Sequence, residues 1–306
     1  MLMQRNAVWL PWLAIFASVL FLGLGTSWAK HSLFPAVGAQ GTTAVRVGFS
    51  ALILLLLCRP WRWPLSAADR RAALLYGAAL GLMNLSFYMA LRTLPFGVAV
   101  AIEFSGPLAV AVWASRRPLD FVWVLLAVAG LGLLLPLGHA VSSLDPVGVL
   151  WAVLAAVCWA SYILFGKRIG HLPVAHSVSL GLAMAALVVL PVGVVHAGSA
   201  LLSPSVLLVG LGVAAVSSAL PISLEMVALK RLPPQAFGIM LSMEPAVAAV
   251  LALLLLDEQL SAVQWLAIGL IVLASMGSAL TASMATLVKE KSRSRADALQ
   301  ADFSAK

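Results

Sequence analysis

The sequence predicts an all-α integral membrane protein with ten transmembrane helices, and three observations lead to this prediction. First, 62% of the 306 residues are hydrophobic and only 10% are charged, whereas soluble globular domains contain about 45–50% apolar and about 25% charged residues. Second, the apolar residues fall into runs of about 20, the length that crosses a bilayer as a helix. Third, short turns containing polar residues and proline separate the runs. A single water-soluble core cannot bury so much apolar surface.

Ten runs qualify as membrane spans, and most connections between them are short. The runs cover roughly 8–29, 37–57, 72–91, 96–115, 121–138, 147–166, 174–195, 205–229, 235–256 and 262–284. Connections such as RTLP (92–95), KRIGHLP (167–173) and KRLPP (230–234) combine basic residues with a proline that ends one helix and starts the next. We expect the first run to be a retained helix rather than a cleaved signal peptide, because further spans follow it.

The basic residues predict the orientation of the spans. Cytoplasmic loops of membrane proteins carry an excess of Lys and Arg. If the N-terminus lies inside and the spans alternate, sixteen of the 19 Lys and Arg residues fall on the cytoplasmic side, and only Lys30 and Arg92 fall outside. We therefore expect both termini in the cytoplasm. The net charge of +8 sits in short clusters between apolar runs, which predicts contact with the lipid bilayer and not with nucleic acid.

Two segments of the chain repeat each other in an inverted sense. ALRTLPFGVAVAIEFSGPLAVAV (90–112) aligns with ALKRLPPQAFGIMLSMEPAVAAV (228–250), and two prolines with the same spacing match. The offset corresponds to five predicted spans, and an odd number reverses the direction in which the second copy enters the membrane. Inverted repeats are typical of transporters whose binding site lies between the halves. We therefore expect one five-helix repeat at 1–143, a second at 144–284 and a disordered cytoplasmic tail at 285–306.

Ionisable residues inside the predicted spans mark candidate site positions. They are Arg46, Glu103, Glu225 and Glu244. A charge at the centre of a membrane helix costs roughly 2.5–3.5 kcal/mol on insertion scales, so these groups face a wet cavity, pair with each other or take up protons. Glu103 lies four residues before Pro107 and Glu244 lies one residue before Pro245. When the two prolines are aligned, the positions of the two glutamates in the repeat differ by three residues. Residues three apart share a helix face, so we predict a cavity role for both glutamates.

Each of these features also has a purely structural interpretation. Arg46 suits two roles equally, as a cation that meets a substrate carboxylate or as a counter-ion that pairs with a glutamate to fix helix packing. Glu225 lies about one turn from Lys230 and Arg231, so an ion pair at the membrane interface is at least as well supported as a cavity role. Pro107 and Pro245 each predict a helix kink, which either frees a carbonyl for function or serves static packing.

Further polar side chains cluster within other spans, and the sequence includes no enzyme signature. Asn84 and Tyr88 share a helix face, and Tyr162 lies within a later span. Trp28 and Trp159 occupy comparable places in the first helix of each half, although aromatic residues at span ends are typical of the membrane interface. The motif GAALG at 77–81 predicts close helix packing. There is no phosphate loop, zinc motif or nucleophile–base pair, so we expect neither catalysis nor a metal or other cofactor.

Two stretches resemble the EamA family of the drug/metabolite transporter superfamily. They are IEFSGPLAVAVWASRRPLDFVWVLLAVAGLGLLLPLG (102–138) and SSALPISLEMVALKRLPPQAFGIMLSMEPAVAAV (217–250), within a resemblance that runs from about residue 9 to 283. The resemblance implies an exporter of small amino acids, such as threonine and homoserine, in the bacterial inner membrane, with proton coupling. It implies site roles for the matching residues Glu103, Ser105, Gly106, Pro107, Glu225, Ser242, Glu244 and Pro245.

Several functions remain open at this stage. We expect a monomeric or weakly dimeric carrier that works by alternating access and is driven by a proton gradient. The same family resemblance also covers exporters of aromatic amino acids, nucleobases or drugs. A passive channel is the rival from a different class, because a channel needs a continuous wet path and the glutamates beside prolines inside spans do not exclude one.

Overall fold

In the computed structural model, every element of the described residues is helical. The structure describes residues 2–62, 65–94, 96–115, 117–134 and 145–241, and then 243–244, 246–247, 250–251, 262–263, 265–274, 276–278, 280–281 and 284. The predicted tail at 285–306 and the predicted boundary between the two halves at 143–144 lie outside the described residues.

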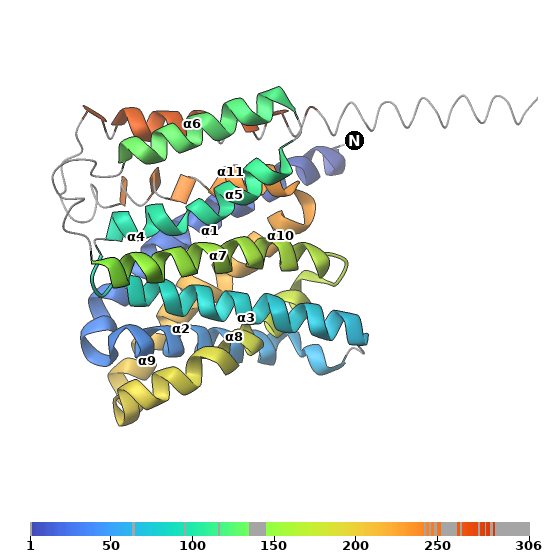
Figure 1. Ribbon diagram of the computed structural model, residues 1–306. Coiled ribbons are helices and arrows are strands. Elements are labelled where there is room, and N and C mark those ends of the chain that lie inside the picture. Colours follow the sequence, from blue (N-terminus) through green and yellow to red (C-terminus); the bar gives the residue numbers. More distant parts are fainter. Residues whose placement is uncertain are drawn as a thin grey trace, which may run out of the picture.

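The helices lie side by side and form a layered bundle (Figure 1). In chain order they are α1 (Leu2–Ser32), α2 (Phe34–Cys58), η1 (Pro60–Arg62), α3 (Ala67–Ala90), α4 (Phe96–Glu103), α5 (Ser105–Ala114), α6 (Pro118–Leu134), α7 (Pro146–Arg168), α8 (Val174–Ala197), η3 (Gly198–Leu202), α9 (Pro204–Ala214), η4 (Ala215–Ala219), α10 (Leu220–Arg231) and α11 (Pro234–Leu241). Helices α9, η4 and α10 follow one another without a break and form one long rod.

Length and composition support the membrane assignment. Within the described residues, six helical stretches are long and apolar enough to cross a bilayer: Trp9–Ser32, Phe34–Cys58, Ala67–Ala90, Pro146–Arg168, Val174–Leu202 and Pro204–Arg231. Each predicted span from 8–29 through 205–229 overlaps helical structure. The last two predicted spans are described only in part, so the total of ten helices stays a prediction. The all-helical membrane class is confirmed.

The helix predicted over 96–115 is interrupted, and the break lies three residues before the proline. Helix α4 ends at Glu103, Phe104 forms a turn, and α5 begins at Ser105. A proline ring inside a helix clashes with the carbonyl four residues earlier, which for Pro107 is the carbonyl of Glu103. Restarting the helix places Pro107 in the first turn of α5, where its missing N–H is not needed. The helix is therefore interrupted at Phe104, whereas a kink caused by Pro107 stays a prediction.

Small residues allow α3 to pack closely on α8, as the GAALG motif predicts. A Cβ added to Gly77 would lie 2.5 Å from the carbonyl oxygen of Gly181. A Cβ added to Gly81 would lie 2.9 Å from the carbonyl oxygen of Ala185. Both distances are shorter than real Cβ contacts allow, so the two backbones approach where only glycine fits. The prediction of close packing at this motif is confirmed.

The start of α7 is fixed by a cap on the loop that precedes it. The carboxylate of Asp145 accepts hydrogen bonds from the backbone N–H groups of Val147 and Gly148, both at 3.2 Å. A hydrogen bond with the Thr93 side chain, followed by the bond from the Val147 N–H, holds the pKa of Asp145 below its usual range. Because Thr93 lies in the turn after α3, this cap also ties two loops together.

Candidate functional site

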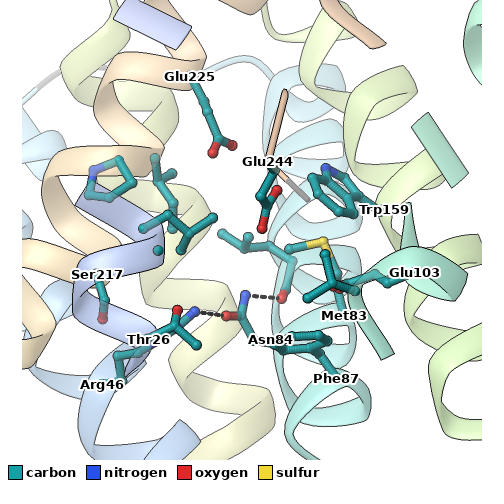
Figure 2. A pocket seen from close by; sticks show the side chains of 16 residues that line it. Thr26, Arg46, Met83, Asn84, Phe87, Glu103, Trp159, Ser217, Glu225 and Glu244 are labelled. Atoms are coloured by element: carbon teal, nitrogen blue, oxygen red, sulfur yellow. Dashed lines mark hydrogen bonds between the residues drawn. The ribbon is translucent and has the colours of Figure 1, made fainter. Parts of the chain in front are cut away.

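A mostly apolar cavity that contains several buried charged side chains lies among α1, α2, α3, α4, α7, η4 and α10 (Figure 2). Its lining consists of Leu22, Gly23, Thr26, Arg46, Leu80, Met83, Asn84, Phe87, Val100, Glu103, Trp159, Ser217, Pro221, Ile222, Glu225 and Glu244. Arg46 and all three predicted membrane glutamates are among these residues. The cavity volume is about 60 Å³.

Arg46 is held in place by α3. Its Nη1 donates a hydrogen bond to the Tyr88 hydroxyl at 3.0 Å, and its Nη2 donates one to Asn84 Oδ1. The guanidinium carbon also lies 5.1 Å from the centre of the Tyr88 ring, within range of a cation–π interaction. Asn84 is oriented by a bond from its own Nδ2 to the Leu80 carbonyl at 2.9 Å. Asn84 and Tyr88 therefore lie on one face of α3, as predicted, and both serve Arg46.

One nitrogen of Arg46 has no partner. The side chain is only 4% exposed, and its Nε is buried without a hydrogen bond. Within the described residues, Arg46 forms no ion pair with a carboxylate. The alternative in which Arg46 pairs directly with a glutamate is therefore not what the structure adopts. An unpaired N–H on a buried cation is able to donate to a carboxylate, and charge-assisted hydrogen bonds of this kind are among the strongest.

Glu225 is fixed by hydroxyl groups from two other helices. Ser18 of α1 donates to Glu225 Oε1 at 3.0 Å, and Tyr162 of α7 donates to Glu225 Oε2 at 3.2 Å. The alternative of an interfacial ion pair with Lys230 or Arg231 is wrong. Among the described residues Glu225 forms no ion pair with either, and the Lys230 ammonium instead donates to the Leu172 carbonyl. Glu225 is thus a cavity residue with both oxygens oriented by neutral donors.

Glu103 and Glu244 face the same space from different helices. Glu103 lies at the end of α4, next to the break at Phe104, and it is 5% exposed. Figure 2 shows the Glu244 carboxylate between Glu225 and Trp159. Glu244 Oε2 is buried and has no hydrogen-bond partner. Glu103 also interacts electrostatically with Glu244 and with Arg46.

An indole N–H and a hydroxyl complete the polar lining. Trp159 of α7 is 4% exposed, and its Nε1 is buried without a partner. The ring packs edge-to-face on Phe104 with centroids 5.8 Å apart, which fixes its orientation. Ser217 lies in the π-helical segment η4. Such π-helical segments are frequent at functional sites. Pro221 marks this segment in the sequence, because a proline has no N–H to donate to the regular helix ladder.

Not every predicted site residue lines the cavity. Trp28 is 41% exposed and lies against Gly212, because it points about 200° around α1 from the cavity residue Thr26. Tyr162 lies behind Glu225, and Ser105 is exposed on α5. Ser242 and Pro245 are outside the described residues. The sequence reasoning missed Ser18 and did not weigh Thr26 singly, although Thr26 belongs to a polar cluster of the first span.

Membrane-length helices around a cavity with buried charges are the architecture expected of a membrane transporter. Residues 146–280 match the model of the EamA-like transporter family. The chain belongs to this family, because relatives that are 48–49% identical align with 94% of its length. Family membership makes the protein a transporter and not an enzyme, and the predicted family resemblance is confirmed.

The relatives carry a specific name. The threonine/homoserine exporter RhtA of Escherichia coli (strain K12) is 49% identical over 288 residues, which is 94% of this chain and 97% of the relative. The threonine/homoserine exporter RhtA of Salmonella typhimurium (strain LT2) is 48% identical over 287 residues, with the same shares of both chains. One crystal structure matches with a TM-score of 0.63 and 21% identity, covering 90% of this chain and 98% of that chain. At that identity the likeness concerns the fold alone.

Proposed function

We propose that this protein is a secondary transporter of the bacterial inner membrane that exports small amino acids, with threonine and homoserine as its substrates. The observation that carries the proposal is the distribution of charge in the cavity. A buried guanidinium with a free N–H lies among three carboxylates, one of which has an unpartnered oxygen. A zwitterionic amino acid has the matching pair of charges. The name of the relatives, which describes exporters of these two amino acids, supports the same substrate.

In this proposal each charge has a partner on the substrate. The substrate carboxylate binds at Arg46, and its ammonium binds near Glu103 or Glu244. The unpartnered indole N–H of Trp159 then remains as a donor to the substrate side chain. The Ser217 hydroxyl donates to the Val213 carbonyl at 2.7 Å, so it remains as an acceptor only. Substrate bound in this way would give partners to buried polar atoms, each of which costs about 1–3 kcal/mol of free energy while it has no hydrogen bond.

The size of the cavity favours a small substrate over the alternatives. Its volume of about 60 Å³ is far below the roughly 300–1,000 Å³ of pockets for drug-sized ligands. A single water molecule needs about 10–15 Å³ on a comparable scale, so the space suits one small polar solute. Aromatic amino acids, nucleobases and drugs therefore rank behind threonine and homoserine.

We propose two inverted five-helix halves, at 1–143 and 144–284, and the contacts between helices support a correspondence between the halves. If α1 corresponds to α7, α2 to α8 and α3 to the α9–α10 rod, exchanging the halves maps the α3–α7 contact onto the α1–α10 contact. The same exchange maps the α3–α8 contact onto the α2–α9 contact. All four contacts occur. Such symmetry suits a carrier that alternates its access about a fixed site, with both termini in the cytoplasm as the basic residues predict.

We further propose that export is coupled to protons through Glu103 and Glu244. The test is threonine efflux from proteoliposomes driven by an imposed pH gradient. Replacement of either glutamate by glutamine (Glu103→Gln or Glu244→Gln) keeps the shape but removes the titratable group, and it should abolish the gradient dependence. Counterflow should persist in both variants, but it should need a higher threonine concentration in the variant whose glutamate also binds the substrate ammonium. If both variants respond to the gradient as the unmodified protein does, the coupling role is wrong.

A passive channel is distinguished from a carrier by counterflow. Vesicles loaded with unlabelled threonine should transiently accumulate labelled threonine above its equilibrium level if a single site alternates between the two sides. A pore gives simple equilibration without this overshoot. The protein is expected to perform counterflow as a monomer or weak dimer.

A further inference from the structure

Two lysines join the loops at one end of the bundle. Lys167 lies near the end of α7, and Lys230 lies near the end of α10. Lys167 Nζ donates a hydrogen bond to the carbonyl oxygen of Leu232, in the loop after α10. Lys230 Nζ donates one to the carbonyl oxygen of Leu172, in the loop after α7. Each lysine therefore holds the loop that follows the other lysine's helix.

Each of the two acceptor carbonyls belongs to a leucine that precedes a proline. Leu172 precedes Pro173, and Leu232 precedes Pro233. A residue before proline is restricted to extended backbone, and Leu232 has φ −95° and ψ 148°. The carbonyl of such a residue stays outside the hydrogen-bond ladder of the helix that follows, so it is available to another donor. An ammonium is a strong donor for it, because hydrogen bonds from charged groups are about twice as strong as neutral ones.

Other contacts hold the loop between α7 and α8 in the same place. Lys230 Nζ also donates to Ser177 Oγ at 3.1 Å, near the start of α8. Ser177 Oγ in turn donates to the Ile169 carbonyl at 3.3 Å. His171 Nε2 lies 3.0 Å from Asp69 Oδ1 in the first turn of α3. Groups from α3, α8 and α10 therefore hold this loop.

Fully buried side chains fill the space between these lysines and the cavity. Tyr76 and Tyr162 stack with their ring centroids 5.0 Å apart. Ile163, Met226 and Leu229 are also 0% exposed. At 1.5 Å per helical residue, the cavity glutamate of α10 lies about 7.5 Å along the helix from the lysine at its end. The described residues therefore close this end of the cavity with one tight layer under the lysines.

We propose that Lys167 and Lys230 form a latch that holds this end of the transporter closed and that has to release before the cavity opens there. The proposal rests on the alternating access of the proposed function. In the predicted topology this end faces the cytoplasm, so release of the latch would be the step that admits substrate for export. Both bonds cross between the loops of α7 and α10, so neither can persist if these helix ends separate.

The latch is tested by the chemical accessibility of the layer beneath it. In a background with both cysteines replaced (Cys58→Ser and Cys158→Ala), Met226→Cys places a single thiol in that layer. Inside-out membrane vesicles expose the cytoplasmic face to a membrane-impermeant maleimide, and the labelling rate reports how often this end opens. No substrate is needed, so the result does not depend on the identity of the transported solute.

The lysine variants have matched controls beside them in the sequence. Lys167→Met and Lys230→Met remove the donors, and each should raise the labelling rate about tenfold, the equivalent of losing one charge-assisted hydrogen bond. Arg168→Met and Arg231→Met remove an equal charge from exposed neighbours and should leave the rate unchanged. Rates in the lysine variants that match those of the arginine controls would overturn the proposal.

A second variant separates a released latch from a damaged fold. Lys167→Arg keeps a cationic donor and should retain the slow labelling of the unmodified layer, whereas a rate equal to that of Lys167→Met would contradict the latch. Counterflow of threonine by the unmodified protein is measured in parallel. Its absence alone would refute the proposed substrate, while unchanged labelling in the lysine variants alone would refute the latch.

Discussion

Replacing Arg46 by lysine tests the substrate site most sharply, because it keeps the charge and removes the geometry. Arg46 uses two nitrogens to bind Tyr88 and Asn84, and it leaves Nε free at the cavity. A lysine ammonium is a compact point charge without this planar fork. In Arg46→Lys the three N–H donors all leave one nitrogen, so they cannot reach the separate positions at which Nη1, Nη2 and Nε of Arg46 meet Tyr88, Asn84 and the substrate carboxylate.

The magnitude follows from the number of bonds lost. Each hydrogen bond to a charged group contributes about 1.5–3 kcal/mol, and every 1.4 kcal/mol is a factor of about ten in affinity. Loss of one such bond to the substrate predicts that Arg46→Lys binds threonine about 10- to 100-fold more weakly. Arg46→Met removes the charge altogether and should abolish measurable binding.

The assay is calorimetric titration of purified protein in detergent with threonine. Tyr88→Phe is the matched control, since it removes one acceptor of Arg46 but keeps the ring that lies 5.1 Å from the guanidinium. It should weaken binding less than Arg46→Lys does. If folded Arg46→Lys binds threonine within twofold of the unmodified protein, the carboxylate of the substrate does not bind at Arg46.

Three further predictions concern the support of the site. Ser18→Ala removes a donor to Glu225 and should lower the unfolding free energy by about 1–3 kcal/mol, measured by chemical denaturation in micelles. Gly106→Ala places a Cβ 2.1 Å from a backbone carbonyl oxygen of α7 and should lower the melting temperature. The control Gly132→Ala, whose added Cβ has no atom within 4 Å, should not lower it. Equal melting temperatures of the two variants would refute the close approach at Gly106. Because the pKa of Asp145 is lowered in the folded state, its contribution to stability is present above its unfolded pKa of about 3.9 and is lost as the pH falls through the folded value. Asp145→Ala should therefore flatten the loss of stability on acidification, and an unchanged pH profile would contradict this.

The fold class and the charged site residues could be predicted because each signal is local. A run of about 20 apolar residues has few alternatives to a membrane helix. A glutamate or arginine within such a run is costly unless it has a role, which is why Arg46, Glu103, Glu225 and Glu244 could be named in advance. All four line one cavity in the structure.

The arrangement around those charges could not be predicted, because it depends on contacts between distant segments. The bond from Ser18 to Glu225 joins residues 207 positions apart, and no local pattern distinguishes Ser18 from other serines in spans. The orientation of Trp28 away from the cavity depends on the rotation of α1 within the bundle. The position of the break at Phe104 could have been inferred, since the proline rule concerns the carbonyl four residues earlier.

The most direct test of a zwitterion site between Arg46 and the glutamates is competition in threonine counterflow by blocked analogues. Unmodified threonine and homoserine should inhibit the uptake of labelled threonine in proteoliposomes. N-acetylthreonine, which lacks the ammonium, and threonine methyl ester, which lacks the carboxylate, should each inhibit at least about tenfold more weakly, since each loses a charge-assisted contact. Equal inhibition by either blocked analogue, or the absence of counterflow, would contradict the proposed site.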